Sequence, residues 1–302
     1  MKKRKNNIPL IIRIMRAIFP WLETYVPFLS DRLFRLVFYV PVTYPLPEKE
    51  REAEKSGQEF SLVVGAKTIR GHRWGDPGRP YVLFVHGWAG RATQFRRFIK
   101  PLLAAGFQVI GPDGPAHGRS DGFKTSILEF EDMFHALFSK FGQPAGIITH
   151  SFGGAAVLYA GMNGLAIGTL VNIASPSLTD EILKTYLRAI NGSWKSAERF
   201  KRFVVQEAGK SFDEFTALHA VSKLQHPVRL LLIDDEDDKE VITMHADALL
   251  KVYPTAILFR TSGLGHNRIL KDEKVIQKAI GFIRGNIPEP SASTMAGSLP
   301  AR

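Results

Sequence analysis

Residues 146–156 read Gly146-Ile147-Ile148-Thr149-His150-Ser151-Phe152-Gly153-Gly154-Ala155-Ala156, and this stretch decides the fold. The apolar run at 146–149 predicts a buried strand, and residues 154–162 predict a helix. A serine between such a strand and a helix lies on a sharp turn that exposes its hydroxyl group. Small residues after the serine let the helix approach the strand without a steric clash. The stretch therefore favours Ser151 as a nucleophile over a glycine-rich turn with a purely structural role.

Short apolar strands and amphipathic helices alternate on both sides of this turn. The predicted strands span residues 60–64, 67–74, 81–85, 107–110, 146–149, 169–174, 228–233 and 256–260. The predicted helices span residues 94–105, 127–141, 154–162 and 244–252, with a last helix that ends near 282. This alternation predicts an α/β fold with a mostly parallel central sheet and helices on both faces. Ligands of such sheets bind at the carboxyl ends of the strands.

Polar residues follow the last two predicted strands. Residues 234–240 read Asp-Asp-Glu-Asp-Asp-Lys-Glu, and His266 stands between Gly265 and Asn267. An imidazole at this edge of the sheet can act as the base for a serine, and a carboxylate can orient it. One of the acids would fill that role, and most of the others are expected to form a solvated loop.

Glycine-rich turns follow two earlier strands. His86-Gly87-Trp88-Ala89-Gly90 can aim backbone N–H groups into the cleft, and acyl transfer needs two donors for the developing oxyanion. The N–H groups of Trp88 and Phe152 are the best pair, and His86 is expected to hold its turn. Asp113 and His117 are expected to shape their loop, because one histidine and one aspartate do not make a metal site.

Four motifs together make the chain resemble the α/β-hydrolase superfamily over residues 60–285. They are the segments 86–90, 113–120 and 150–154 and the pair at 265–266. The resemblance implies a Ser151–His266–acid triad, an acyl-enzyme mechanism and a helical cap insertion, with no metal and no cofactor. The family's acid usually lies in a Gly-x-x-Asp-x-x-Val string. With Asp235 at the glycine position, the register selects Asp238, three residues before Val241, and leaves Asp237 and Asp235 as fallbacks.

One residue departs from the family pattern. The position two residues before the nucleophile is usually glycine, and Thr149 occupies it here. A β-branched side chain crowds the approach of strand and helix, so the fine geometry of the turn is open.

The alternation of strands and helices divides the chain into four parts. We expect a helical N-terminal extension at residues 1–50, an α/β core at 51–176 and 227–286, a helical cap at 177–226 and a disordered tail at 287–302. Aromatic residues of the cap form its own core or line a pocket for acyl or aryl groups. Trp88, Trp194 and Phe203 are the predicted pocket residues. The basic residues of the cap are expected to form a solvated face, and binding of an acidic substrate or a lipid headgroup stays open as the alternative.

Composition narrows the classes of site and partner. The chain has 302 residues, a formal net charge of +11 and no cysteine, which excludes disulfides, thiolate metal sites and cysteine nucleophiles. The absence of cysteine fits a reducing compartment, and a cytoplasmic location is expected. No zinc-finger spacing or ribonucleoprotein motif occurs, so no nucleic-acid partner is predicted. The sequence leaves the oligomeric state open.

The first 45 residues combine a basic start with many apolar and aromatic residues. Arg13 and Arg16 interrupt the apolar run, so it fits neither a secretory signal nor a membrane-spanning helix. Two interpretations stay open: an amphipathic segment lying on the inner membrane surface, and a helical extension packed on the body of the protein.

Three functions are compatible with these features. The first is hydrolysis of a small or medium acyl ester by a Ser151–His266–Asp238 triad. The second is a C–C bond hydrolase with the same triad. The third is a non-catalytic ligand-binding or membrane-associated protein on this fold. The intact set of three residues argues against the third.

Overall fold

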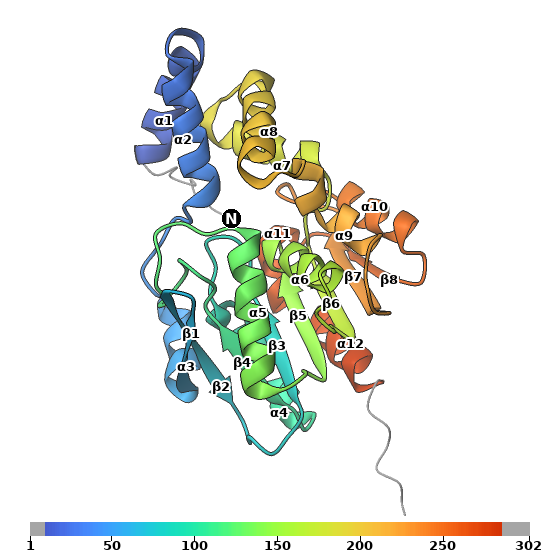
Figure 1. The fold of residues 1–302 in the computed structure, drawn as a ribbon. Coiled ribbons are helices and arrows are strands. Elements are labelled where there is room, and N and C mark those ends of the chain that lie inside the picture. The colour runs from blue at the N-terminus through green and yellow to red at the C-terminus, as the bar shows by residue number, and fades with distance from the viewer. Residues whose placement is uncertain (1–9, 286–302) are drawn as a thin grey trace, which may run out of the picture.

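The structure, a computed structural model that describes residues 10–285, is built on one eight-stranded sheet (Figure 1). The predicted tail at 287–302 lies outside the described residues. The strands are β1 (Gln58–Val64), β2 (Lys67–Trp74), β3 (Tyr81–Val85), β4 (Gln108–Pro112), β5 (Gly146–His150), β6 (Thr169–Ile173), β7 (Arg229–Asp235) and β8 (Ile257–Thr261). Their spatial order is β1-β2-β4-β3-β5-β6-β7-β8. Only β2 runs antiparallel to its neighbours, so the predicted mostly parallel sheet is confirmed.

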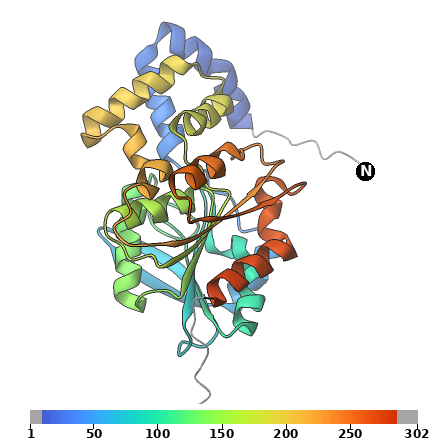
Figure 2. The ribbon, with the colours of Figure 1, turned by 90° about the vertical axis from the view of Figure 1, so that its right-hand side faces the viewer.

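Helices cover both faces of this sheet because its inner strands are apolar on both sides. In β3, Leu83 and Val85 face one hydrophobic cluster, and Val82 and Phe84 face the other. The first cluster is closed by α5 (Ile127–Phe141), α6 (Phe152–Met162), α9 (Ala217–Val221) and α10 (Met244–Val252). The second is closed by α3 (Glu48–Ser56), α4 (Arg96–Ala104) and α12 (Glu273–Arg284) (Figure 2).

The end of β7 differs from the sequence expectation. The strand continues through Asp234 and Asp235, which pair with Arg260 and Thr261 of β8. Both aspartates are buried, so the interpretation of these two acids as part of a solvated loop was wrong. The physical reason is that each carboxylate has fixed hydrogen-bond donors inside the protein, which offset the loss of hydration.

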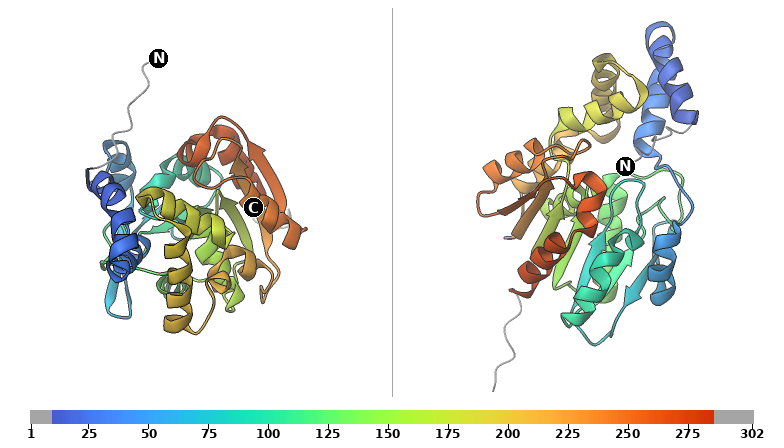
Figure 3. Two further views of the ribbon diagram at one scale, coloured as in Figure 1. Left: turned by 90° about the horizontal axis from the view of Figure 1, so that it is seen from above. Right: turned by 180° about the vertical axis from the view of Figure 1, so that it is seen from behind.

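Four helices gather beyond the carboxyl ends of the strands, and we call them the helical layer (Figures 1 and 3). They are α1 (Leu10–Tyr25), α2 (Pro27–Tyr39), α7 (Thr179–Ile190) and α8 (Trp194–Ala208). The short helix η2 (Phe212–Phe215) closes the hydrophobic core of this layer. Phe19 of α1 and Phe34 of α2 are buried in that core against Phe200 and Leu187. The helices at the start of the chain therefore pack on the segment inserted after β6.

Polar contacts fix the same packing. The Glu23 carboxylate accepts hydrogen bonds from the Ser193 backbone N–H at 3.1 Å and from the Ser196 hydroxyl at 2.6 Å. The Asp31 carboxylate accepts one from Arg199 Nε at 2.6 Å. Both carboxylates of α1 and α2 are thus turned inward, toward α8. None of the helices within residues 10–285 is both long and apolar enough to cross a membrane.

A substitution in the core of the helical layer tests this packing. Phe34→Ala should lower the free energy of unfolding by about 3–5 kcal/mol, because it leaves a cavity in a closely packed cluster. Urea denaturation measures the loss, and hydrogen exchange should localise it to α1, α2, α7 and α8. Phe28→Ala, on the exposed side of α2, is the matched control and should change stability by less than about 0.5 kcal/mol. Equal effects of the two substitutions would show that α2 does not pack as described.

Candidate active site

Ser151 lies on a sharp turn between β5 and α6. Its backbone adopts φ +53° and ψ −129°, a left-handed conformation that a residue with a side chain adopts only when its surroundings impose it. Its N–H donates to the Ile173 carbonyl of the next strand at 2.9 Å. A Cβ at Gly153 would lie 2.5 Å from the Val85 carbonyl, and one at Gly87 would lie 2.7 Å from the Ser151 Cβ. The glycines are therefore needed for the close approach around the serine.

Thr149 fits beneath this turn although a smaller residue is usual there. Its side chain is buried, and its hydroxyl donates to Asn172 Oδ1 at 3.0 Å. Space for the amide comes from Gly154, where a Cβ would collide with Asn172 Oδ1. The threonine, the asparagine and the glycine form one matched set, and the turn keeps its sharp form.

Asp238 is the acid that contacts His266. The His266 Nδ1 lies 2.7 Å from Asp238 Oδ2, and Asp238 is buried. The second carboxylate oxygen accepts the backbone N–H groups of Glu240 at 2.8 Å and Val241 at 2.9 Å. These donors hold the carboxylate in place, so it can fix the tautomer and the orientation of the imidazole.

The neighbouring acids hold the loop that carries the histidine. Asp235 accepts hydrogen bonds from the Gly265 N–H at 2.7 Å and from the Thr261 hydroxyl at 2.7 Å. Asp237 accepts the Gly263 N–H at 2.7 Å. Asp235 and Asp237, the two fallback candidates, are therefore bound to the backbone of the loop. The sequence did not predict that these two acids hold the histidine loop. The one feature that could have indicated it is that the acids directly follow a predicted strand.

Burial and two carboxylates set the charge state of His266. Burial lowers the pKa of the imidazole, but the hydrogen bond and the charge of Asp238 outweigh that effect, and the pKa stands above its ordinary value. Glu240 adds to the increase, since its Oε2 lies 3.9 Å from His266 Nε2. The imidazole must lose this proton before it can act as a base.

His150 is a second histidine beside the serine that sequence reasoning did not assign. Its Nε2 lies 2.9 Å from the His266 carbonyl oxygen, so the Nε2 atom carries the proton and donates it to that oxygen. Burial, and then the nearby charge on His266, lower the pKa of His150 to about 3. This neutral side chain ties the backbone of His266 to the end of β5, directly before Ser151.

The predicted oxyanion donors lie on two fixed segments. The Ala89 N–H donates to His117 Nε2 at 3.0 Å, and the Gly114 N–H donates to His86 Nε2 at 2.7 Å. Both histidines thus hold the loops, as expected from the sequence. The Trp88 and Phe152 rings lie edge to face with centroids 5.4 Å apart. A Cβ at Gly87 would lie 2.7 Å from Ser151 Cβ, so the backbones just before Trp88 and Phe152 are neighbours. The N–H of Phe152, the first residue of α6, has no partner inside its helix.

The Asp113 carboxylate also serves loop structure. Its two oxygens accept the backbone N–H groups of Ala92 at 2.9 Å and Arg119 at 3.0 Å. Within residues 10–285 we find no group of three or more histidine, aspartate or glutamate side chains placed to hold a metal ion.

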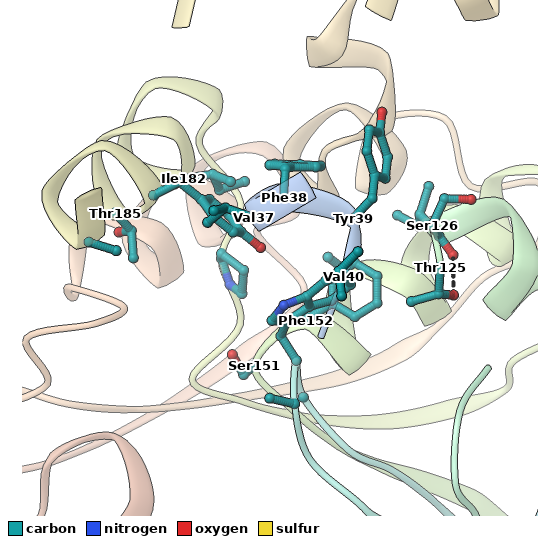
Figure 4. A pocket seen from close by; sticks show the side chains of 18 of the residues that line it. Val37, Phe38, Tyr39, Val40, Thr125, Ser126, Ser151, Phe152, Ile182 and Thr185 are labelled. Carbon is teal, nitrogen blue, oxygen red and sulfur yellow. Dashed lines mark hydrogen bonds between the residues drawn. The ribbon is translucent and has the colours of Figure 1, made fainter. Parts of the chain in front are cut away.

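A cavity of about 940 Å³ lies above the serine, and Ser151, His266 and Trp88 line it. Figure 4 shows Val37, Phe38, Tyr39 and Val40 on the opposite side from Ser151, with Ile182 and Thr185 of α7 beside them. Most of the lining is apolar. Residues 33–44 form a large part of this wall, so the N-terminal extension packs on the body of the protein and also lines the cavity, a role that the sequence did not predict.

Two predicted pocket residues lie outside this lining. Trp194 is exposed at the start of α8, with Lys201 Nζ 4.9 Å from its ring centroid. Phe203 packs on Phe200, and the Arg35 guanidinium covers its other face at 4.4 Å. The assignment of Trp194 and Phe203 to the pocket was therefore wrong, because Trp194 lies at the solvent-exposed start of α8 and Phe203 packs within the helical layer, and neither lines the cavity.

Comparison with known proteins gives matches across this core. The model of the alpha/beta hydrolase family matches residues 82–278. The chain is 25% identical over 176 residues to a protein named probable serine hydrolase from Drosophila melanogaster, which covers 55% of this chain and 52% of that protein. The chain thus spans about half the length of this curated relative.

Solved structures share the fold at low sequence identity. A putative lipase from Acinetobacter baumannii is 18% identical with a TM-score of 0.61, and the match covers 80% of this chain and 98% of that one. An esterase from Pyrococcus furiosus is also 18% identical with a TM-score of 0.61, covering 82% and 97%. Because the family model spans the sheet from β3 onward and includes Ser151, Asp238 and His266, the chain belongs to the alpha/beta hydrolase family.

Proposed function

We propose that this chain hydrolyses carboxylic esters, with Ser151 as nucleophile, His266 as general base and Asp238 as the acid that orients it. The observation that carries the proposal is the 2.7 Å contact between Asp238 and His266 at the cavity that Ser151 lines. The strained turn supports the choice of serine, because it exposes the hydroxyl to the cavity.

The proposed reaction has two steps. His266 Nε2 takes the proton from Ser151 Oγ as this oxygen attacks the ester carbonyl, and the N–H groups of Trp88 and Phe152 stabilise the oxyanion. The protonated His266 then gives the proton to the leaving alkoxide, and an acyl-Ser151 ester remains. Water, deprotonated by His266, attacks this ester. As the bond to Ser151 Oγ breaks, His266 returns the proton to that oxygen and a carboxylic acid is released. The reaction needs no metal or cofactor.

The cavity supports an ester with a sizeable apolar part. Its volume lies at the upper end of ordinary ligand sites, about 300–1,000 Å³, and its lining is mostly aliphatic and aromatic. The lipase and the esterase that share the fold act in the same chemical class by their names. A panel of chromogenic esters of increasing acyl length, with a β-diketone as the carbon–carbon alternative, tests the assignment. Turnover of the diketone alone, or of nothing, would contradict it.

Ser151 should be the reactive serine. A fluorophosphonate probe should label it, and Ser151→Ala should abolish labelling and lower kcat by several powers of ten with the fold intact. Mass spectrometry of the labelled peptide identifies the site. Ser175→Ala, two residues beyond the end of β6, is the matched control, and this variant should still be labelled at Ser151. Labelling of any other serine in active protein would reject the nucleophile.

Asp238 should be the acid that matters most for turnover. Asp238→Asn should lower kcat by about 10⁴-fold, because the amide favours the wrong tautomer of His266. Steady-state kinetics measure the loss. Asp237→Asn, one residue away and bound to the loop backbone, should cost less than about tenfold. If Asp237→Asn is the more damaging of the two, Asp238 is not the triad acid.

The pH dependence should report the proton on His266. Activity requires the neutral imidazole, so kcat/KM should fall as pH decreases through the raised pKa of His266. Glu240→Gln removes a charge that raises this pKa and should shift the acidic limb to lower pH. Glu236→Gln, exposed on the same loop, should leave the limb in place. A limb that Glu240→Gln leaves unchanged or moves to higher pH would contradict this explanation.

A further inference from the structure

A stripe of large apolar residues faces water along the first two helices. Its members recur every three or four residues, are 46% to 69% exposed, and are Ile14, Ile18, Trp21, Tyr25 and Phe28. This spacing places them on one side of α1 and at the start of α2. Single exposed apolar residues are ordinary, but a continuous stripe marks a surface for interaction. We call it the outer stripe.

The outer stripe is not the side of α1 and α2 that packs into the hydrophobic core. Phe19 and Phe34, on the other sides of the same helices, are buried in the core of the helical layer. The helices are therefore already packed on α7 and α8, and the outer stripe is additional apolar surface.

The exposed side of α2 leads from the outer stripe to the cavity. Leu29 and Leu36 are exposed along α2, and Leu36 also lines the cavity. Val42, Tyr44 and Leu128 share both properties, since each is exposed to solvent and each lines the cavity. Figure 4 shows the end of α2 across the cavity from Ser151. The rim of the cavity is thus apolar and continuous with the helix that carries the end of the outer stripe.

The basic residues of the segment that carries the outer stripe favour one kind of partner. Arg13 and Arg32 are exposed on these helices, and Lys2, Lys3, Arg4 and Lys5 precede α1 in the sequence. The two acids within residues 10–39 are both bonded toward α8. A basic surface with interleaved aromatic rings suits an anionic bilayer, where arginines reach the headgroups and rings lie below them. A second copy of the chain would instead bring like charges together.

We propose that the outer stripe docks on an anionic lipid bilayer and that ester substrates pass from the bilayer over Leu36 and Val42 into the cavity. The substrate class is then a lipid ester whose acyl chain occupies the apolar cavity. The hydrolytic part of this inference rests on the proposed function, whereas the docking part rests only on the outer stripe and its charges.

Vesicle binding by the full chain tests the docking. The protein should co-sediment with phosphatidylcholine vesicles that contain phosphatidylglycerol, less at high salt, and less with phosphatidylcholine alone. The variant Trp21→Ser/Tyr25→Ser/Phe28→Ser should bind these vesicles at least about tenfold more weakly. The control Val205→Ser/Met244→Ser/Ile257→Ser removes similarly exposed apolar residues from other surfaces and should bind like the parent chain. Point variants are used because deletion of α1 and α2 would open the cavity.

Two substrates separate docking from chemistry. The Trp21/Tyr25/Phe28 variant should hydrolyse a water-soluble acetate ester at the parent rate, and hydrolyse an ester embedded in vesicles at least about tenfold more slowly. Ser151→Ala should bind vesicles as the parent does. If the parent chain hydrolyses neither ester, and it binds vesicles while the Trp21/Tyr25/Phe28 variant does not, the proposed function fails and the docking stands.

Three results would overturn the docking. One is equal vesicle binding by the parent chain and the Trp21/Tyr25/Phe28 variant. Another is equal loss of both esterase rates in that variant, which would indicate damage to the site. The third is a parent chain that ignores vesicles and sediments as a dimer that the variant dissociates, which would assign the outer stripe to a second copy of the chain.

Discussion

The left-handed backbone of Ser151 is the constraint on which the rest of the site depends. A residue with a side chain adopts this conformation at a cost, and the surrounding structure must impose it. Here the turn is held from three sides: β6 accepts the Ser151 N–H, and glycines at 87 and 153 let the neighbouring backbones approach. Because Gly87 has no side chain, the loop that carries Trp88 can lie directly beside the serine. The geometry of the proposed nucleophile and that of its oxyanion donors therefore have one origin.

The second half of the site is held by carboxylates that do not face the cavity. Asp235 and Asp237 bind the backbone at residues 263–265, while Asp238 binds the imidazole itself. His150 adds a contact from the serine side by donating to the His266 carbonyl. The position of the histidine is thus determined by hydrogen bonds to its backbone as well as to its ring. A run of acids that looks like a solvated loop instead forms the support of a histidine.

Sequence periodicity predicts the sheet and the helices that cover it. The choice of Asp238 over its neighbours came from the resemblance, through the register of the family's acid string, and the contact of Asp238 with His266 agrees with that choice. Helices α5 and α10 have the predicted limits because each has a clear apolar face bounded by turn residues. The burial of Asp234 and the lining of the cavity by residues 33–44 could not be predicted, since both depend on partners far away in the sequence. Trp194 and Phe203 failed for the same reason: composition shows that α8 is aromatic, but only packing decides which side faces the serine.

If the proposed function holds, Ser151 forms a covalent acyl intermediate at the cavity that the first helices help to line. Acid quenching of the protein during turnover of a slow ester, followed by mass spectrometry, measures this most directly. We expect an acyl group on the peptide that contains Ser151, formed in an initial burst and lost with time. Continuing turnover with Ser151 unmodified at every time point would contradict it.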